Sequence, residues 1–294
     1  MNKIFLTGGS GFVGQSVKTY FRLLIHELDL RNNCLVTLDG NVILHLAGKS
    51  HDLKNIFDSR EYYEVNTELT KKVYDAFLAS QAKVFITLSS VKAVADQVDR
   101  ELTEEHSQNP VTHYGKSKLL AEQYIFSQSI PKSKRVYVLR PCMIHGEGNK
   151  GNLNILYKIA SRNIPWLLGS FENKRSFCSI DNLMFILKEL IEREDIPSGI
   201  YNVADDEPIS TNELISLIAQ SQNRKPIIWR ISKGLIEGIA SIGDKIHLPL
   251  NTERLCKLTS SYVVSNAKIK AAIGKPFPIS SREGLLKTFK SFSV

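Results

Sequence analysis

The chain has 294 residues, of which 43% are hydrophobic, and a formal net charge of +8 at pH 7. This length can bury the core of one α/β domain with a small lobe, and the composition is ordinary for a soluble globular protein. No apolar stretch is long enough to span a bilayer, and the chain enters a strand at once, so we expect neither a membrane span nor a signal peptide. The four cysteines contain no C-x-x-C pair, which favours reduced thiols in the cytoplasm, and we expect no metal site.

The positive charge is compatible with three kinds of partner. It would suit nucleic acid, an acidic membrane surface or a substrate that carries a diphosphate. No basic run is interleaved with aromatic residues, so we expect no nucleic-acid partner.

The first predicted unit is a strand at residues 3–7, a glycine-rich turn and a helix at residues 12–20. The glycines of the turn are spaced as G-x-x-G-x-x-G, which allows a tight turn and a close approach of the backbone to a pyrophosphate. The first turn of the helix presents free N–H groups to the same phosphates. We therefore predict a dinucleotide site. The residues concerned are Gly8, Gly11, Phe12, Val13 and Gly14.

The second predicted strand, residues 24–29, should supply an acid for the adenosine ribose, because such an acid follows the glycines by about 20 residues. Asp29 fits this position, and Asp39 is the alternative if the strand is instead 34–38. An ionised Asp29 would repel a 2′-phosphate and favour NAD, whereas Arg31 would attract one. We expect NAD, with NADP possible; the simpler interpretation is a surface pair of Asp29 and Arg31.

Strands and helices alternate along the next part of the chain, which predicts a parallel, doubly wound sheet. The expected strands are 42–47, 84–89 and 135–140, and the expected helices are 66–80 and 113–127. The stretch before residue 48 is short for a complete strand–helix–strand–helix unit. We therefore expect one crossover helix to be trimmed or missing.

The predicted helix at 113–127 carries Tyr114 and Lys118, which share one helix face because they are four residues apart. A free tyrosine has a pKa near 10, and a nearby cation lowers it. Such a tyrosine can exchange a proton with a sugar hydroxyl or a ketone. Ser90 follows the strand at 84–89 and could face the same cofactor from a second side. Each feature alone is common, so the prediction rests on their combination.

Together these motifs resemble the extended short-chain dehydrogenase/reductase superfamily, in its NAD-dependent epimerase/dehydratase family. Later segments match family motifs in order: 139–141 with 145–148, 152–153, 175–182 and 199–203. The resemblance implies a Rossmann-type fold with a small C-terminal substrate-binding lobe. It places the NAD(P)-binding domain at 1–150, with returning segments near 176–203, and mainly the substrate lobe at 151–294.

The resemblance implies that Tyr114 transfers the proton, that Lys118 lowers its pKa and binds the nicotinamide ribose, and that Ser90 binds the reacting sugar oxygen. Asn152 and Arg175 are implied to bind substrate, with Arg175 clamping the diphosphate; an ordinary surface arginine is the alternative. Further implied cofactor contacts, besides Tyr114 and Lys118, are Leu46, Ala47, Gly48, Ser89 and Pro141. Ser89 is also the weaker alternative to Ser90.

Three other residues are given structural interpretations. His45 is expected to be a packed strand residue, and Arg140 a structural residue at a strand end. Asn66 is expected to support the lysine through a hydrogen bond or to cap a helix.

Residues 148–154 and 163–169 resemble a branch found in bacterial surface-polysaccharide pathways. The implied function is NAD(P)-dependent oxidoreduction at C4 of a nucleotide-linked sugar, as in a UDP-hexose or UDP-hexosamine 4-epimerase. The alternatives are an NAD(P)H-dependent 4-keto reductase of a UDP-6-deoxyhexosamine and a non-catalytic dinucleotide-binding protein. A dehydratase is disfavoured because no carboxylate follows Ser90.

Two regions leave the quaternary structure open. Helices 66–80 and 113–127 could pair across a homodimer, although a core-facing helix looks the same in sequence. Residues 225–275 are the least informative. Within them, 234–242 could cover the substrate, line a dimer or lie against a membrane, and its helical spacing favours a core-facing helix.

Overall fold

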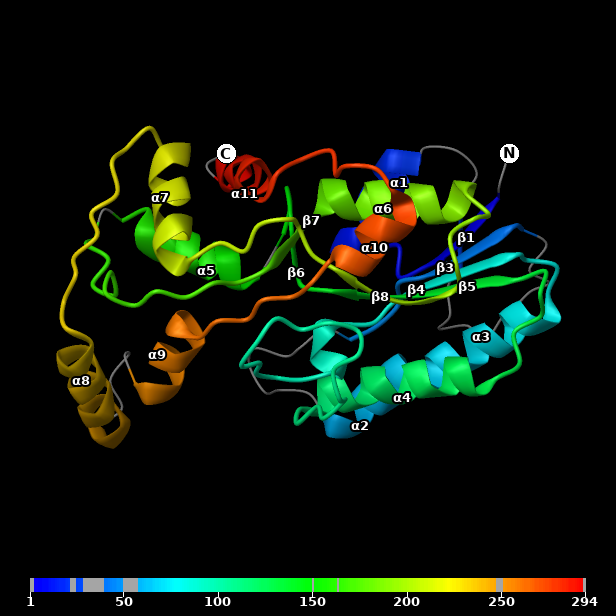
Figure 1. Cartoon of the computed structure of the whole chain (residues 1–294), viewed down its shortest axis with the longest axis horizontal. Coiled ribbons are helices and arrows are strands. Elements are labelled where there is room, and N and C mark those ends of the chain that lie inside the picture. The colour runs from blue at the N-terminus through cyan, green and yellow to red at the C-terminus, as the bar shows by residue number, and fades with distance from the viewer. Residues whose placement is uncertain are drawn as a thin grey trace.

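A six-stranded parallel sheet forms the centre of the protein, with strand order β2-β1-β3-β4-β5-β8 (Figure 1). The strands are β1 (Ile4–Thr7), β2 (Ile25–Glu27), β3 (Val42–His45), β4 (Val84–Leu88), β5 (Arg135–Pro141) and β8 (Gly199–Val203). This computed structural model describes residues 3–21, 25–28, 40–49, 58–149, 151–162, 164–246 and 251–292. The predicted doubly wound parallel sheet is confirmed.

Helices cover both faces of the sheet, which explains why its strands are continuous apolar runs. On one face lie α1 (Phe12–Phe21), α6 (Ile180–Glu192) and α10 (Ala267–Ile273). On the other lie α2 (Ser59–Tyr62), the π-helix η2 (Tyr63–Glu68), α3 (Leu69–Ala79) and α4 (His113–Ser127). Every residue of β3 is buried, as expected for a strand between two helical layers.

The chain reverses its direction across the sheet at β1, because β2 pairs with one side of β1 and β3 with the other. Ligands of open α/β sheets bind at the carboxyl ends of the strands beside such a reversal. Thr7, Glu27 and His45 end these three strands and therefore mark the edge where a site is expected. The connection between β2 and β3 lies mostly outside the described residues, so the trimmed crossover stays a prediction.

A smaller lobe extends from the carboxyl edge of the sheet (Figure 1). Its core joins α5 (Asn152–Ala160), α7 (Thr211–Ser221) and α11 (Ser281–Ser291) with the strand β7 (Phe177–Ser179). Strand β7 pairs in parallel with β6 (Met143–His145). The predicted division into domains stays a prediction, although α10 packs with the core of the sheet rather than with the lobe.

The outer end of the lobe is formed by α8 (Lys233–Ile246) and α9 (Thr252–Thr259), which contact each other (Figure 1). Their small core contains Leu168, Ile236, Ala240 and Leu255. No helix in the described ranges is long and apolar enough to cross a membrane.

Candidate active site

The glycine turn after β1 is held in a shape that side chains would not permit. Gly8 has a φ of +74°, and a Cβ there would lie 2.6 Å from the amide nitrogen of Ala47. A Cβ on Gly14 would lie 2.3 Å from the carbonyl oxygen of Gly8. The Gly11 amide closes the turn by donating to the Gly8 carbonyl at 3.1 Å. Helix α1 begins directly afterwards, at Phe12, so its free N–H groups face the space above the turn.

This turn lines a cleft of about 1280 Å³, which is large enough for a dinucleotide. The predicted residues Gly8, Gly11, Phe12, Val13, Gly14, Leu46 and Gly48 line it. Gly146–Asn149, from the loop after β6, line it as well. Ala47 does not line the cleft. Its N–H donates to the Thr7 hydroxyl at 3.2 Å, and its backbone lies against Gly8. The close approach of glycines to neighbouring backbone and the helix N-terminus fit a bound NAD.

Glu27 is an acid at the end of the second strand that the sequence interpretation did not consider. Glu27 is the last residue of β2, and its carboxylate lies so near Gly9 that a Cβ there would be 2.4 Å from it. It also accepts from Lys18 at 3.3 Å. Asp29 and Asp39 lie outside the described residues. The end of the strand could have indicated Glu27, because β2 ends two residues before Asp29.

A second pocket, of about 260 Å³, adjoins this cleft and shares Leu46, Gly48 and Leu88 with it. The predicted catalytic residues Ser90, Tyr114 and Lys118 all line this pocket. Its other lining residues are Lys49, Ser89, Pro141, Cys142 and Ile144. The fold therefore brings the three residues together beside the nucleotide cleft.

Close packing of α4 places Tyr114 near Ser90. Gly115 lies against the carbonyl oxygen of Lys92, and a Cβ at Gly115 would be only 2.3 Å from it. The Thr112 hydroxyl caps α4 by accepting from the Gly115 amide at 3.2 Å. Gly115 thus allows α4 to approach the segment that follows β4.

The pKa of Tyr114 differs from the sequence-based expectation. Burial raises this pKa, and a hydrogen bond with Ser90 acts in the opposite direction. The Lys118 ammonium donates to the carbonyl oxygen of Leu88 at 2.9 Å. Burial lowers the pKa of Lys118 to about 8, and the nearby Glu122 opposes that shift. Burial therefore opposes the expected lowering of the Tyr114 pKa, and the part of Lys118 in lowering it stays a prediction.

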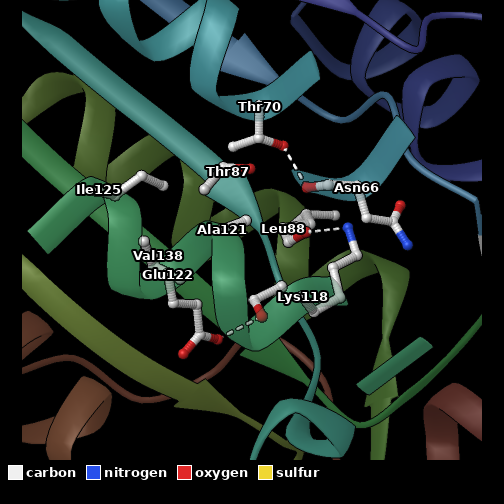
Figure 2. Close-up of a pocket in the computed structure, with 10 residues that line it drawn as sticks. Asn66, Thr70, Thr87, Leu88, Lys118, Ala121, Glu122, Ile125 and Val138 are labelled. Atoms are coloured by element: carbon white, nitrogen blue, oxygen red, sulfur yellow. Dashed lines mark hydrogen bonds between the residues drawn. The ribbon is translucent and has the colours of Figure 1, made fainter. Parts of the chain in front are cut away.

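Figure 2 shows the buried polar groups behind Lys118. Glu122, one turn further along α4, accepts a very short hydrogen bond from Ser89. Arg140 donates from its Nε to both oxygens of Glu122, at 3.0 and 3.1 Å. Arg140 and Glu122 are almost completely buried, so the ion pair joins β4, α4 and β5 directly beneath the pocket. Arg140 is structural, as expected, while its partner Glu122 was missed.

Gly48 and Asn66 fix the position of the lysine from the opposite side. A Cβ on Gly48 would lie 2.9 Å from the Lys118 ammonium and 3.1 Å from the Asn66 side-chain oxygen. Asn66 accepts from the Lys49 amide at 2.8 Å and donates to the Ser117 hydroxyl at 3.0 Å. It lies inside η2, so the helix-cap interpretation of Asn66 was wrong, and its support of the lysine is indirect.

A chain of buried hydrogen bonds assigns the tautomer of His45. The Thr70 hydroxyl donates to the Asn66 carbonyl at 2.8 Å, so it accepts from His45 Nε2 at 3.0 Å. His45 Nδ1 then accepts from the Thr7 hydroxyl at 2.7 Å, whose oxygen accepts from Ala47 N–H. Burial lowers the pKa of His45 to about 3. His45 is thus a neutral packing residue that ties β1 and β3 to η2.

The two predicted substrate residues do not line either pocket. Asn152 is an exposed residue at the start of α5. Arg175 is partly buried, and its guanidinium donates to the Lys257 carbonyl at 2.9 Å. Burial lowers the pKa of Lys92, the nearby Asp96 opposes this shift, and Arg175 adds a smaller lowering. Lys92 therefore lies near both an acid and an arginine.

Among the described residues, no group of three or more histidines, cysteines or acids could hold a metal ion. The described cysteines, Cys142, Cys178 and Cys256, are free thiols.

Comparisons with known proteins agree with this geometry. Residues 22–204 match the NAD dependent epimerase/dehydratase family. The UDP-glucose 4-epimerase of Vibrio cholerae is 27% identical, and the match covers 98% of this chain and 95% of that protein. The N-acetyl-alpha-D-glucosaminyl-diphospho-ditrans,octacis-undecaprenol 4-epimerase of Escherichia coli O157:H7 is 29% identical over 76% of this chain and 73% of that protein.

A solved structure shares the fold. The UDP-glucuronic acid 4-epimerase from Bacillus cereus, in complex with NAD, superposes with a TM-score of 0.76 over 99% of this chain and 98% of that one. The two sequences are 16% identical, so this likeness concerns the fold alone.

Proposed function

Since the chain belongs to the NAD-dependent epimerase/dehydratase family, we propose that it is a 4-epimerase of a UDP-linked hexose or hexosamine, in surface polysaccharide biosynthesis. One observation carries this proposal: the pocket lined by Ser90, Tyr114 and Lys118 shares Leu46, Gly48 and Leu88 with the nucleotide cleft. A sugar held in this pocket would have its reacting carbon next to the nicotinamide end of a dinucleotide. Both relatives described above are 4-epimerases, which supports the choice of C4.

Each residue of the pocket has a separate task. Bound NAD would supply the hydride acceptor and donor. Tyr114 takes the proton from the C4 hydroxyl and later returns it. Ser90, already hydrogen-bonded to Tyr114, binds the same sugar oxygen and keeps it in line with the phenol. Lys118 keeps a positive charge beside the nicotinamide ribose at neutral pH, because its pKa of about 8 leaves most of it protonated.

Glu27 is the residue that we assign to the adenosine ribose. Its carboxylate lies beside Gly9 at the end of β2, the position from which an acid reaches ribose hydroxyls in this type of fold. A negative charge there opposes a 2′-phosphate, so we assign NAD rather than NADP. Arg175 and Asn152, at the start of α5, are the residues that we assign to the nucleotide-sugar substrate, with Arg175 on its diphosphate.

We infer that two copies pair through α3 and α4. Leu120 and Phe126 of α4 are exposed apolar side chains on the helical layer that covers the sheet. Free thiols at Cys142, Cys178 and Cys256 fit a reducing compartment, so we place the enzyme in the cytoplasm.

A second candidate substrate is a sugar diphosphate carried by a polyprenyl lipid. The name of the E. coli relative specifies such a substrate. The reaction at C4 would be the same, and only the group beyond the diphosphate would differ.

The deciding experiment follows the sugar and the cofactor together. NMR would monitor interconversion of UDP-N-acetylglucosamine with UDP-N-acetylgalactosamine, and of UDP-glucose with UDP-galactose, without added cofactor. Denatured protein would be assayed for released NAD. Turnover with near-stoichiometric NAD supports an epimerase, whereas an empty protein that consumes NADPH with a 4-keto sugar would identify a reductase instead.

A further inference from the structure

Helix α8 carries an apolar stripe that faces solvent. Leu235, Ile239, Ile242 and Ile246 are 57%, 40%, 56% and 62% exposed. Their spacing of four, three and four residues places them within about 60° of one another around the helix. The residues of α8 that do pack inward, Ile236, Ala240 and Gly243, form a separate adjacent face. The expectation that 234–242 faces the core was therefore wrong for three of its five apolar residues, Leu235, Ile239 and Ile242.

The part of the chain that contains α8 is predominantly basic in sequence. Residues 224–257 contain seven lysines and arginines but only three acids. Glu237 and Asp244 lie about 170° from the centre of the stripe, on the opposite side of α8. Asp244 already accepts from the amide and hydroxyl of Thr252, and Glu253 is paired with Lys257. Lys233 lies about 150° from the stripe centre, whereas Lys245 lies about 90° from it and is the charged residue of α8 nearest to the stripe.

An exposed tryptophan lies close to α8 in the fold. Trp229 is 54% exposed, and its backbone pairs with Trp166 on the segment that also supports α8 through Leu168. Tryptophan is the residue that most often occupies the boundary between water and lipid, because it has a large apolar ring with one N–H.

We propose that α8 and Trp229 form a docking surface for an anionic lipid bilayer, on which the enzyme lies peripherally. An interfacial helix combines an apolar face of this kind with basic flanks and buries that face at the level of the lipid headgroups. Figure 1 shows α8 at the end of the molecule farthest from the sheet, where a flat surface can reach it.

A second protein copy fits this stripe less well than a bilayer does. Helix α8 is about 21 Å long and 10 Å wide, so its stripe offers roughly 200 Å², whereas a stable interface buries about 800 Å² on each partner. The excess of basic residues in 224–257 would also make two copies repel each other, while anionic headgroups would attract this part of the chain. This docking surface goes beyond the proposed 4-epimerase activity and does not depend on which sugar is used.

Flotation of the full-length chain with vesicles tests the proposal. Wild-type protein should float with vesicles of phosphatidylcholine and phosphatidylglycerol in equal amounts, and less with phosphatidylcholine alone. The variant L235S/I239S/I242S should lose flotation by about tenfold or more, because its apolar side chains no longer enter the lipid. The variant K245E should reduce flotation on the anionic vesicles. The matched control I155S/I159S changes two exposed apolar residues of α5 and should float as wild type does.

The proposal would be overturned if the wild type did not float or if the L235S/I239S/I242S variant floated normally. It would also be overturned if light scattering showed that this variant forms a smaller oligomer than the wild type. The last result would identify α8 as an interface between copies. Because the α8 side chains are exposed, turnover of a soluble UDP-sugar should be unchanged in this variant. Flotation without any UDP-sugar turnover would leave the docking surface standing and reject the proposed activity.

Discussion

The carboxyl edge of the sheet and the outer end of the lobe are built in opposite ways. At the sheet edge, charged and polar side chains such as Lys118, Glu122 and Arg140 are buried and hydrogen-bonded. At the outer end, apolar side chains of α8 are exposed, and only a small cluster of buried residues supports the helix. Buried polar groups cost free energy unless they are paired, so they persist where geometry matters for chemistry. Exposed apolar groups persist where something else covers them.

The largest expected effect is on catalysis. Tyr114→Phe removes the proton-transfer group and should lower turnover by about 10³-fold, while NAD remains bound. The neighbouring Tyr62, whose ring centre is 6.2 Å from that of Tyr114, offers the matched control Tyr62→Phe, which should retain most activity. Turnover of a UDP-sugar and released NAD are the measurements. Near-normal turnover by Tyr114→Phe would remove Tyr114 from the mechanism.

The next expected effect is on stability. Arg140→Met leaves the carboxylate of Glu122 buried without its cation and should lower the free energy of unfolding by about 3–5 kcal/mol. The double variant Glu122→Leu/Arg140→Met should recover part of this loss, because no uncompensated charge remains. Urea unfolding measures both. An Arg140→Met variant as stable as wild type would show that the ion pair is not needed beneath the pocket. The control Lys245→Met, on α8, should change the free energy of unfolding little.

Substitution of one glycine in each region tests the comparison directly. Gly48→Ala places a methyl group against the Lys118 ammonium and should reduce turnover by about 10²-fold through displacement of that side chain. Gly234→Ala, in α8, meets no atom within 4 Å and should leave turnover unchanged. Steady-state kinetics of the two variants is the measurement. Equal effects from both would contradict the view that only the sheet edge is tightly packed around the reaction.

Cofactor selection depends on a smaller interaction. Glu27→Gln should weaken NAD binding by about tenfold and narrow the preference over NADP, since one charged hydrogen bond to the ribose is replaced by a neutral one. Glu237→Gln on α8 is the matched control. Titration of each variant with NAD and NADP, after removal of resident nucleotide, gives the affinities. Unchanged affinities would indicate that an acid outside the described residues, rather than Glu27, binds the adenosine ribose.

The smallest expected effect is a pH dependence of Lys118. Its pKa of about 8 in the folded chain lies below the ordinary value of 10.5, so between these values the unfolded chain binds more protons. This group's contribution to stability therefore rises with pH across that window, relative to Lys118→Met. Turnover should instead fall by about half at pH 8, because it needs the lysine cation. Activity that stays level to pH 9 would contradict this role.

The sequence by itself determined most of the site. Glycine spacing, apolar strands and the Tyr–Lys interval report local geometry, since each follows from backbone conformation or from one helix face. These features predicted the parallel sheet and the family, which the structure and comparisons confirmed, and they predicted that Ser90, Tyr114 and Lys118 would face one cofactor.

Only the tertiary structure decided the rest. Glu122 and Arg140 are brought together from different elements, and Glu27 could be proposed as the ribose-binding acid only after the end of β2 was known. The direction of the Tyr114 pKa shift depends on burial, which a residue interval does not contain. The apolar spacing of α8 likewise shows that two faces exist, but not which of them another part of the chain covers. Local patterns follow from bonds along the chain, whereas burial and pairing depend on distant residues that only folding brings near.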